Sequence, residues 1–362
     1  MYPPLISIVI PARNEAAYIG RCLESVYAQD LGGLECEVIA ADGMSDDGTS
    51  EKLKTLKSKY PNLKILENPK RTVSSGVNLG IRESKGDVIV RLDAHAEYGA
   101  DYVKNCLEAL ERTGAGNVGG PAIPLPGGGT DMARAIVLAH YSPFGLGGGS
   151  FRKTGAEGFA ETLWPGCFLR EALEKSGLYD ERLTRTEDIE LNARIRKAGY
   201  RVYLSSRIRA FYYCRPNLKE LWRQRWLDGI GVVQTLAVNP GAPRPRHFVP
   251  LAFVSSMILL AALSIPLTPF RWMLAAEAGL YLGAMAWFTL GGLTSLRAAR
   301  ERERERGGAD VKTWNPGLLR LLPPAFAALH FSYGLGSLWA VLSAPAWWAR
   351  FRKPMSFELE NA

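Results

Sequence analysis

Short apolar runs and longer stretches of helical spacing follow one another through the first 200 residues of the chain. The β-branched runs that stop on polar residues have the length of buried strands. The stretches between them repeat apolar residues at helical intervals. This alternation predicts an α/β fold, with a largely parallel sheet and helices on both faces. Predicted strands cover 6–10, 37–41, 63–67 and 88–92, and predicted helices cover 15–27, 50–60, 73–84, 100–112 and 188–197.

Residues 114–158 break this alternation. They contain glycine triplets at 127–129 and 147–149. Glycine-rich composition favours a loop over a core element. The sequence therefore predicts a flexible loop near a site in this region.

The last third of the chain is apolar over lengths close to that of a membrane span, which is about 20 residues. Apolar stretches cover 248–268, 272–296 and 318–348, and Trp272, Trp347 and Trp348 lie near their ends. Soluble helices rarely run this long without a polar face, and tryptophans mark membrane interfaces. We expect two or three transmembrane helices. The pair Pro323-Pro324 is expected to kink the third or make it re-entrant.

Positive charge is concentrated before these apolar stretches. The net charge of the 362-residue chain is +8, and residues 201–247 hold nine Lys or Arg against two Asp or Glu. Such a patch faces phosphates, either of a nucleic acid or of lipid headgroups. The neighbouring apolar stretches and the lack of a nucleic-acid motif favour the membrane. Residues 218–236 have the pattern of a basic amphipathic helix, which predicts either an interfacial position or packing on the catalytic domain.

The expected organisation follows from these patterns. We predict a catalytic domain over 1–214, an interfacial helix and linker over 215–247, membrane helices over 248–348 and a tail over 349–362. The basic loop 297–312 favours the cytoplasmic side. No signal peptide is visible at the N-terminus, so the catalytic domain is expected to be cytoplasmic, at a cell membrane that the chain crosses more than once.

Polar clusters follow the predicted strands, where an open α/β sheet binds its ligands. Asp93 and His95 come directly after the strand 88–92. At this spacing both side chains can point at one divalent cation, and the ligand types suit Mg²⁺ or Mn²⁺. The alternative is a turn in which an aspartate caps a helix. Further clusters lie at 11–15, 42–49 and 186–188.

The order of these clusters resembles family 2 glycosyltransferases, inverting enzymes of the GT-A fold. The resemblance extends from Pro4 to about Gly231. It rests on Ser-Ile-Val-Ile-Pro-Ala-Arg-Asn-Glu at the start, on Asp-Gly-x-Ser-x-Asp-Gly-Thr from Asp42, and on the Glu187-Asp188 pair. Arg223-Gln224-Arg225-Trp226 and the apolar stretches are similar to membrane-anchored enzymes of the succinoglycan type. Family members usually carry a second aspartate where this chain has His95.

The resemblance implies a role for each cluster. Asp188 is implied as the base that deprotonates the acceptor, with Glu187 beside it; the alternative is that both are first-turn acids of a helix. Trp222 stands where processive relatives have glutamine, which favours addition of a single sugar. Nucleotide-sugar contacts are implied for Pro11, Ala12, Arg13, Glu15, Asp42, Arg71 and Asp93, and acceptor contacts for Trp164, Gly166, Arg223, Gln224, Arg225 and Trp226.

The sequence therefore predicts a transferase that uses a nucleotide sugar, most simply a UDP-sugar, and a divalent cation. Its acceptor is expected to be a saccharide on a polyprenyl diphosphate in exopolysaccharide or cell-surface glycan synthesis. Transfer to polyprenyl phosphate itself is the alternative. A membrane scaffold that senses nucleotide sugars is the non-enzymatic alternative, and the intact Asp42, Asp93 and Asp188 argue against it.

Overall fold

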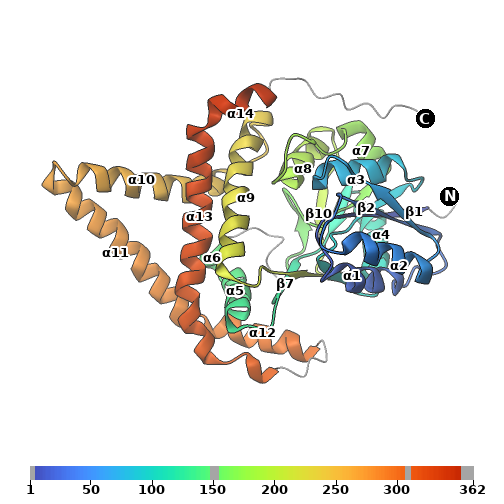
Figure 1. The fold of residues 1–362 in the computed structure, drawn as a ribbon, viewed down its shortest axis with the longest axis horizontal. Coiled ribbons are helices and arrows are strands. Elements are labelled where there is room, and N and C mark those ends of the chain that lie inside the picture. The colour runs from blue at the N-terminus through green and yellow to red at the C-terminus, as the bar shows by residue number, and fades with distance from the viewer. Residues whose placement is uncertain (1–4, 147–154, 306–310, 352–362) are drawn as a thin grey trace.

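The computed structural model describes residues 5–146, 155–305 and 311–351. A sheet domain lies beside a group of long helices, two of which project away from it (Figure 1). The strands are β1 Ile6–Ala12, β2 Cys36–Asp42, β3 Leu63–Glu67, β4 Val88–Arg91, β5 Ala96–Tyr98, β6 Asn117–Gly119, β7 Ala122–Leu125, β8 Gly158–Phe159, β9 Cys167–Leu169, β10 Val202–Leu204 and β11 Ala210–Tyr213.

Helices connect and cover the strands. Those of the sheet domain and its edge are α1 Ile19–Tyr27, α2 Thr49–Lys59, α3 Val73–Arg82, α4 Tyr102–Thr113, α5 Asp131–Tyr141, α6 Pro143–Leu146, α7 Arg170–Ser176 and α8 Glu187–Lys197. The later ones are α9 Leu218–Val238, η2 Pro245–Phe248, α10 Val249–Leu263, α11 Thr268–Leu290, α12 Leu293–Glu305, η3 Val311–Thr313, η4 Pro316–Leu321, α13 Leu322–Leu342 and α14 Ala344–Phe351.

The main sheet has the order β3-β2-β1-β4-β9-β6-β10-β8. Strands β3, β2, β1 and β4 are parallel, whereas β9 runs antiparallel between β4 and β6. Alternate residues of β1 enter different cores. Ile8 packs with α1, α2 and α4 on one face, and Val9 packs with α3, α7 and α8 on the other. The carboxyl ends of the parallel strands therefore meet at one edge.

The Gly-rich region 114–158 is not the flexible loop that its composition predicts. It contains β6, β7 and α5, and β7 joins β5 and β11 in a second sheet. Helix α5 buries Ile136 and Leu138 against α13 residues such as Phe326. The fold of this region thus depends on contacts with residues almost 200 positions away in the chain. Local composition does not reveal such contacts. The second triplet, 147–149, lies outside the described residues.

Helices α9 and α13 run side by side between the sheet domain and the projecting helices (Figure 1). Small residues allow this approach. A side chain at Gly229 would meet the Tyr333 carbonyl, and one at Gly336 would meet the Trp226 carbonyl. The Ser337 hydroxyl donates a hydrogen bond of 3.0 Å to the Gly229 carbonyl. Helix α9 therefore packs on another helix along much of its length.

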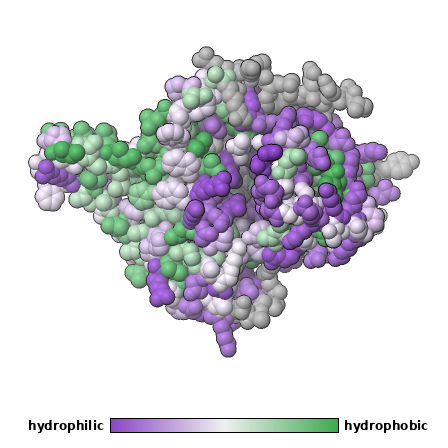
Figure 2. Space-filling model, viewed as in Figure 1, coloured by the Kyte–Doolittle hydropathy of each residue, from purple (hydrophilic) through white to green (hydrophobic). Residues whose placement is uncertain are grey.

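Three helical segments are long and apolar enough to cross a membrane: Pro245–Leu263, Thr268–Arg304 and Pro316–Leu342. In the most apolar 18 residues of each segment, 6% of the first and 0% of the second are buried, compared with 56% of the third. Figure 2 shows the apolar surface spread over the projecting helices. Pro323 and Pro324 lie in the first turn of α13, where the missing N–H is not needed. The expected proline kink within this helix is therefore wrong, whereas the re-entrant path stays a prediction.

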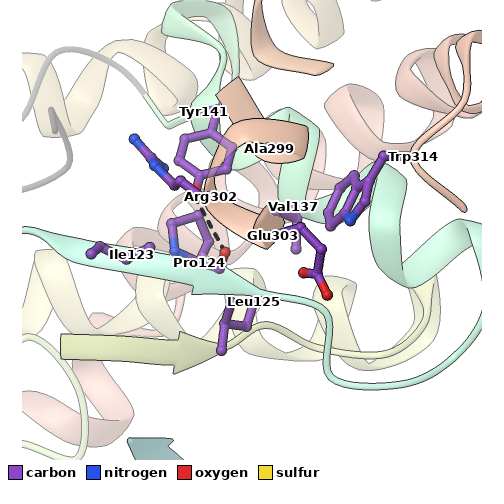
Figure 3. Close-up of a pocket in the computed structure, with 9 residues that line it drawn as sticks. All are labelled: Ile123, Pro124, Leu125, Val137, Tyr141, Ala299, Arg302, Glu303 and Trp314. Atoms are coloured by element: carbon purple, nitrogen blue, oxygen red, sulfur yellow. Dashed lines mark hydrogen bonds between the residues drawn. The ribbon is translucent and has the colours of Figure 1, made fainter. Parts of the chain in front are cut away.

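The segment predicted as a basic loop at 297–312 is largely helical, because α12 continues to Glu305. Its Arg and Glu residues are strong helix formers, which explains this difference. Residues 306–310 lie outside the described residues, as does the tail beyond Phe351. A small pocket separates α12 from α5 and β7, and Tyr141 donates a hydrogen bond of 3.4 Å to the Pro124 carbonyl there (Figure 3). The residues that line it are Ile123, Pro124, Leu125, Val137, Tyr141, Ala299, Arg302, Glu303 and Trp314, none of them a predicted site residue.

Candidate active site

The predicted nucleotide-binding residues gather at the carboxyl ends of β1 and β2. Ala12 pairs with Asp42 in the register of these parallel strands. The buried Asp42 accepts hydrogen bonds from the Ser45 hydroxyl at 2.6 Å and from the Ser50 hydroxyl. These contacts fix the carboxylate at the strand end. A carboxylate has about four acceptor positions, so Asp42 retains capacity for a further donor.

The two predicted basic contacts lie beside this edge. The Arg13 Nη1 donates a hydrogen bond of 3.2 Å to the Arg71 carbonyl, which joins the loop after β1 to the loop after β3. Both arginine side chains are exposed. Arg71 has φ +61°, a left-handed conformation that is uncommon for a non-glycine residue. The two cations therefore flank the strand ends from one side.

Arg91, the last residue of β4, lies at the centre of the site. Its side chain is 2% exposed. Nη1 donates to both carboxylate oxygens of Asp188, at 2.7 and 2.8 Å, and Nη2 donates to Asp93 Oδ1 at 2.9 Å. Glu187 Oε1 lies 3.8 Å from Nη2. One buried cation therefore holds the predicted base and the predicted metal ligand together.

Asp93 is held from its other side by Trp164. The indole Nε1 donates a hydrogen bond of 2.7 Å to Asp93 Oδ2. The Trp164 ring lies edge-on to Tyr212, with ring centroids 5.4 Å apart, and His95 contacts the same tyrosine ring at 5.4 Å. Trp164 therefore positions Asp93 through its nitrogen. Its role in acceptor binding stays a prediction.

His95 and Glu15 form a pair at the same edge. Nδ1 of His95 lies 3.0 Å from Glu15 Oε1. An ionised carboxylate only accepts hydrogen bonds, so Nδ1 carries the proton when this pair forms. In the neutral form of the ring, Nε2 is then the nitrogen without a proton. This arrangement leaves one imidazole lone pair available as a ligand.

Asp188 lies in the first turn of α8, and its helix begins after Thr186, which has φ +60°. The Tyr179 hydroxyl lies 3.2 Å from Asp188 Oδ1 and donates to it. Burial raises the pKa of Asp188, and the charge of Asp93 adds to the rise, while the charge and hydrogen bonds of Arg91 oppose it. The net effect is a raised pKa. An ionised carboxylate with a raised pKa suits general-base chemistry.

Glu187 faces the same guanidinium as Asp188, at a longer distance. Its side chain is 11% exposed. Burial raises the pKa of Glu187 to about 7, the Asp188 charge adds to the rise, and Arg91 and Arg185 oppose it. Near neutral pH this carboxyl is therefore partly protonated.

The raised pKa of Glu187 predicts the pH dependence of stability. The folded chain binds this proton more tightly than the unfolded chain, whose glutamates titrate near 4.3. The stabilisation is full below that value and is lost as the pH rises through 7. We expect Glu187→Gln to raise Tm relative to wild type by several degrees at pH 8 and to change it little at pH 4.5.

A suitable control for this measurement is Glu181. Burial raises the pKa of Glu181, but hydrogen bonds from Lys70 and Asn78 outweigh it, and the pKa is lowered. Glu181→Gln is therefore expected to lower Tm at pH 8. An equal change in Tm for Glu187→Gln at both pH values would contradict the raised pKa.

Helix α9 brings two predicted acceptor residues close to this network. The Gln224 amide donates a hydrogen bond of 2.9 Å to the Tyr212 hydroxyl. Arg225 Nη1 lies 3.0 Å from Asp228 Oδ2, and Arg185 Nε lies 3.9 Å from the other oxygen. The hydroxyls of Thr186 and Thr235 lie 2.6 Å apart. Helix α9 therefore packs directly on the loop that presents Asp188.

The other predicted acceptor residues are less close to the network. Arg223 is exposed, and the described residues provide it with no hydrogen bond or ion pair. The Trp226 backbone packs against α13 at Gly336. Gly166 is buried, and its carbonyl accepts a hydrogen bond of 2.9 Å from the Arg91 amide. A side chain at Gly166 would meet Phe168, so the structure gives this glycine a packing role.

Sequence patterns assigned no role to Arg91, Tyr179 or Tyr212. Arg91 is a charge in a buried strand, which is costly unless it is paired. The sequence could have indicated a role for Arg91 in this way, because an arginine at the end of an apolar run requires acidic partners. The identity of its main partner, 97 residues away, has no local signal.

Comparison with known proteins places this site in a family. The model for glycosyl transferase family 2 matches residues 7–171. The succinoglycan biosynthesis protein ExoA of Rhizobium meliloti (strain 1021) is 35% identical over 291 residues, or 78% of this chain and 86% of that protein. The chain belongs to glycosyl transferase family 2. The predicted glycosyltransferase class is thus confirmed.

Two further relatives extend this comparison. A protein of Methanococcus voltae is 29% identical over 261 residues, which are 70% of this chain and 80% of that protein. Its name is dolichyl N-acetyl-alpha-D-glucosaminyl phosphate 3-beta-D-2,3-diacetamido-2,3-dideoxy-beta-D-glucuronosyltransferase. The mannosyltransferase PcManGT from Pyrobaculum calidifontis, solved with GDP-Man and Mn²⁺, has a TM-score of 0.55 at 20% identity, covering 94% of this chain and 88% of that protein. This similarity confirms the GT-A fold.

Proposed function

We propose that this family 2 glycosyltransferase moves one sugar from a UDP-sugar to a saccharide on a polyprenyl diphosphate, with inversion, in exopolysaccharide or related lipid-linked glycan synthesis. The observation that carries the proposal is the network in which Arg91 joins Asp188 to Asp93. Asp188, the candidate base, and Asp93, a candidate donor-binding carboxylate, therefore contact the same guanidinium. The names of the relatives from Rhizobium meliloti and Methanococcus voltae support the class of product.

The proposed reaction is a single displacement. Asp188 accepts the proton of the acceptor hydroxyl as its oxygen attacks the anomeric carbon of the donor. The bond between that carbon and the diphosphate breaks, and the nucleoside diphosphate leaves with the electron pair. Asp42 would accept a hydrogen bond from the imide of the base, and Pro11, Ala12 and Glu15 would line the base and ribose.

A divalent cation fits the donor set at the edge of the sheet. Asp93 and the free Nε2 of His95 would hold it, with Glu15 fixing the imidazole as second-sphere carboxylates do. Among the described residues no group of three or more His, Cys, Asp or Glu could hold a metal. Two protein ligands completed by diphosphate oxygens are typical of Mg²⁺ sites. The cation, Mn²⁺ or Mg²⁺, would stabilise charge on the leaving diphosphate.

The role of Glu15 can be tested through metal affinity. We expect Glu15→Gln to weaken Mn²⁺ binding in the presence of UDP by about 10- to 100-fold, because an amide oxygen without negative charge makes the imidazole a less basic metal ligand than a carboxylate does. Titration of Mn²⁺ by electron paramagnetic resonance measures this directly. The control is Glu97→Gln, a carboxylate paired with Arg21 at 3.9 Å. Unchanged Mn²⁺ affinity in Glu15→Gln would contradict the proposed ligand set.

The membrane-spanning helices are proposed from the exposure of apolar helices on the surface of the molecule. Helices α10 and α11 are apolar and project from the molecule, and we propose that they cross the membrane as a hairpin (Figure 2). Helices α9 and α13 would lie at the membrane surface, between this hairpin and the catalytic domain. The charge of 201–247 supports attraction to anionic lipids and, beside apolar helices, argues against a nucleic acid as partner. The basic segment near α12 supports a cytoplasmic catalytic domain.

The direct test is sugar transfer by the detergent-purified protein. Labelled UDP- and GDP-sugars are incubated with a lipid extract of the source membranes, with Mn²⁺, Mg²⁺ or a chelator. We expect one donor to label a lipid product, and the chelator to abolish labelling. Nucleotide binding without transfer from any donor, in an extract shown to contain lipid-linked saccharides, would favour the scaffold that senses nucleotide sugars.

A further inference from the structure

Two arginines of one segment contact one glutamate beside the catalytic domain, and a third arginine, on α8, lies near them. Arg244 Nε lies 2.8 Å from Glu161 Oε1, and Arg246 Nη2 lies 2.7 Å from Glu161 Oε2. Arg196 of α8 is close enough to act on the charges of both Arg244 and Glu161. We call Arg196, Arg244, Arg246 and Glu161 the arginine cluster. It holds three positive charges and one negative charge.

The arginine cluster has more positive charge than its own residues neutralise. Arg196 Nε is buried and has no hydrogen-bond partner among the described residues. Burial lowers the pKa of Arg196, and the neighbouring charge of Arg244 lowers it further. Arg244 and Arg246 keep 41% and 46% of their side chains exposed, so a ligand can reach them. Such a site is suited to bind an anion through charge-assisted hydrogen bonds.

The cluster lies where the chain enters its first candidate span. Arg244 and Arg246 belong to the turn that leads into α10, which starts at Val249. The membrane surface must therefore lie close to these arginines if α10 crosses it. The diphosphate of a lipid-linked substrate is confined to the same level, because its polyprenyl chain stays in the bilayer and its charge stays in water.

The same cluster is connected to the catalytic base. Thr162, next to Glu161, has its hydroxyl 3.5 Å from the Asp188 carbonyl and accepts a hydrogen bond of 3.1 Å from Asn192. Arg196 follows Asp188 by eight residues on α8, which is about 12 Å along the helix axis. Arg196 therefore lies about two turns of α8 away from Asp188, which leaves room for a sugar between a phosphate at the cluster and the carboxylate.

We propose that the arginine cluster binds the diphosphate of the lipid-linked acceptor while Asp188 takes the proton of a hydroxyl on the acceptor's sugar. The inference rests on the proposed function and deepens it, because it separates the two acceptor classes. With polyprenyl phosphate itself as acceptor, the attacking oxygen belongs to the phosphate, and the phosphate must lie beside Asp188. Glu161 forms ion pairs with Arg244 and Arg246 until the diphosphate replaces its carboxylate.

Farnesyl diphosphate is the probe for this site, and its affinity for the full chain in neutral detergent is measured by titration calorimetry. We expect Arg244→Gln/Arg246→Gln and Arg196→Gln each to weaken binding at least tenfold, since each removes charge-assisted contacts. Glu161→Gln is expected to tighten binding several-fold, because it removes the competing carboxylate. Arg207→Gln/Arg209→Gln, which removes two exposed arginines of the same basic stretch, is the control and is expected to change nothing.

Several outcomes would overturn the inference. Weaker binding in Glu161→Gln would mean that the ion pairs are a structural latch. Unchanged farnesyl diphosphate affinity in the arginine variants, with reduced binding to phosphatidylglycerol vesicles, would mean a general lipid-headgroup surface. Unchanged affinity in both assays would leave the cluster without an anion role.

A separate result decides the proposed function. UDP binding and Asp188-dependent labelling of the lipid extract test the transferase itself, and neither requires the arginine cluster to bind the probe. If labelling depends on Asp188 but the cluster variants bind farnesyl diphosphate normally, only the inference fails. If no labelling occurs with any donor, the proposed function fails whatever the probe does.

Discussion

Asp188→Asn is expected to lower kcat for sugar transfer by about 10³-fold, within the range found when a general base is removed. Asparagine has nearly the shape of aspartate and still accepts hydrogen bonds from Arg91 Nη1 and the Tyr179 hydroxyl through its carbonyl oxygen. It cannot accept the acceptor's proton. The affinity for UDP is expected to change less than threefold, because Asp188 lies outside the proposed nucleotide contacts. Initial rates at saturating acceptor, with UDP binding on the same samples, measure both quantities.

Tyr179→Phe is the matched control for this prediction. It removes one hydrogen bond from Asp188 and leaves the carboxylate in place. A loss of kcat far smaller than that of Asp188→Asn is therefore expected. Normal turnover by Asp188→Asn would remove Asp188 from its proposed role as base, whatever Tyr179→Phe does.

Arg91→Lys is expected to lower kcat by about 100-fold and to move the acidic limb of the pH profile upward. A lysine has one ammonium group and cannot replace a guanidinium that binds Asp188 through both oxygens and Asp93 at the same time. Arg91 opposes the effect of burial on the pKa of Asp188, so a weaker partner allows this pKa to rise. More of the base is then protonated at a given pH. Rate profiles between pH 5 and 8 measure the shift.

Arg170→Lys is the control for Arg91→Lys. Arg170 also makes several hydrogen bonds, but it donates them to Ser84 and to the Gly86 carbonyl, away from the carboxylates. Its replacement is expected to lower stability without moving the pH profile. Arg91→Met would leave buried carboxylates without their cation, at a cost of about 3–5 kcal/mol in folding free energy. A pH profile of Arg91→Lys that matches wild type would contradict the electrostatic role of Arg91.

The strand ends could be predicted from sequence because their residues are contiguous. Asp93 and His95 follow β4 within four residues, and Asp42 ends β2. Apolar runs of β-branched residues identify such strands without knowledge of their neighbours. The positions of the candidate base and of the nucleotide contacts came from the resemblance, which also depends on short contiguous motifs.

The remaining features depend on contacts between distant parts of the chain. Helix α5 packs on α13, and β7 pairs with β11, so glycine-rich composition alone gave the wrong structure for that region. The link between Arg91 and Asp188 joins a strand to a helix 97 residues later. Glu161 and Arg246 are 85 residues apart. Each such pair depends on how the sheet, α8 and α9 come together, which no local pattern encodes.

We propose that the enzyme adds one sugar, with inversion, to a saccharide already attached to the lipid. The most direct test of this proposal is to isolate the lipid product made by the wild-type protein and determine its mass and the anomeric configuration of the new linkage. We expect a lipid-linked saccharide one sugar heavier than its precursor, with the configuration opposite to that of the donor, and no such product from Asp188→Asn. A retained configuration, or a product with the sugar directly on polyprenyl phosphate, would contradict it.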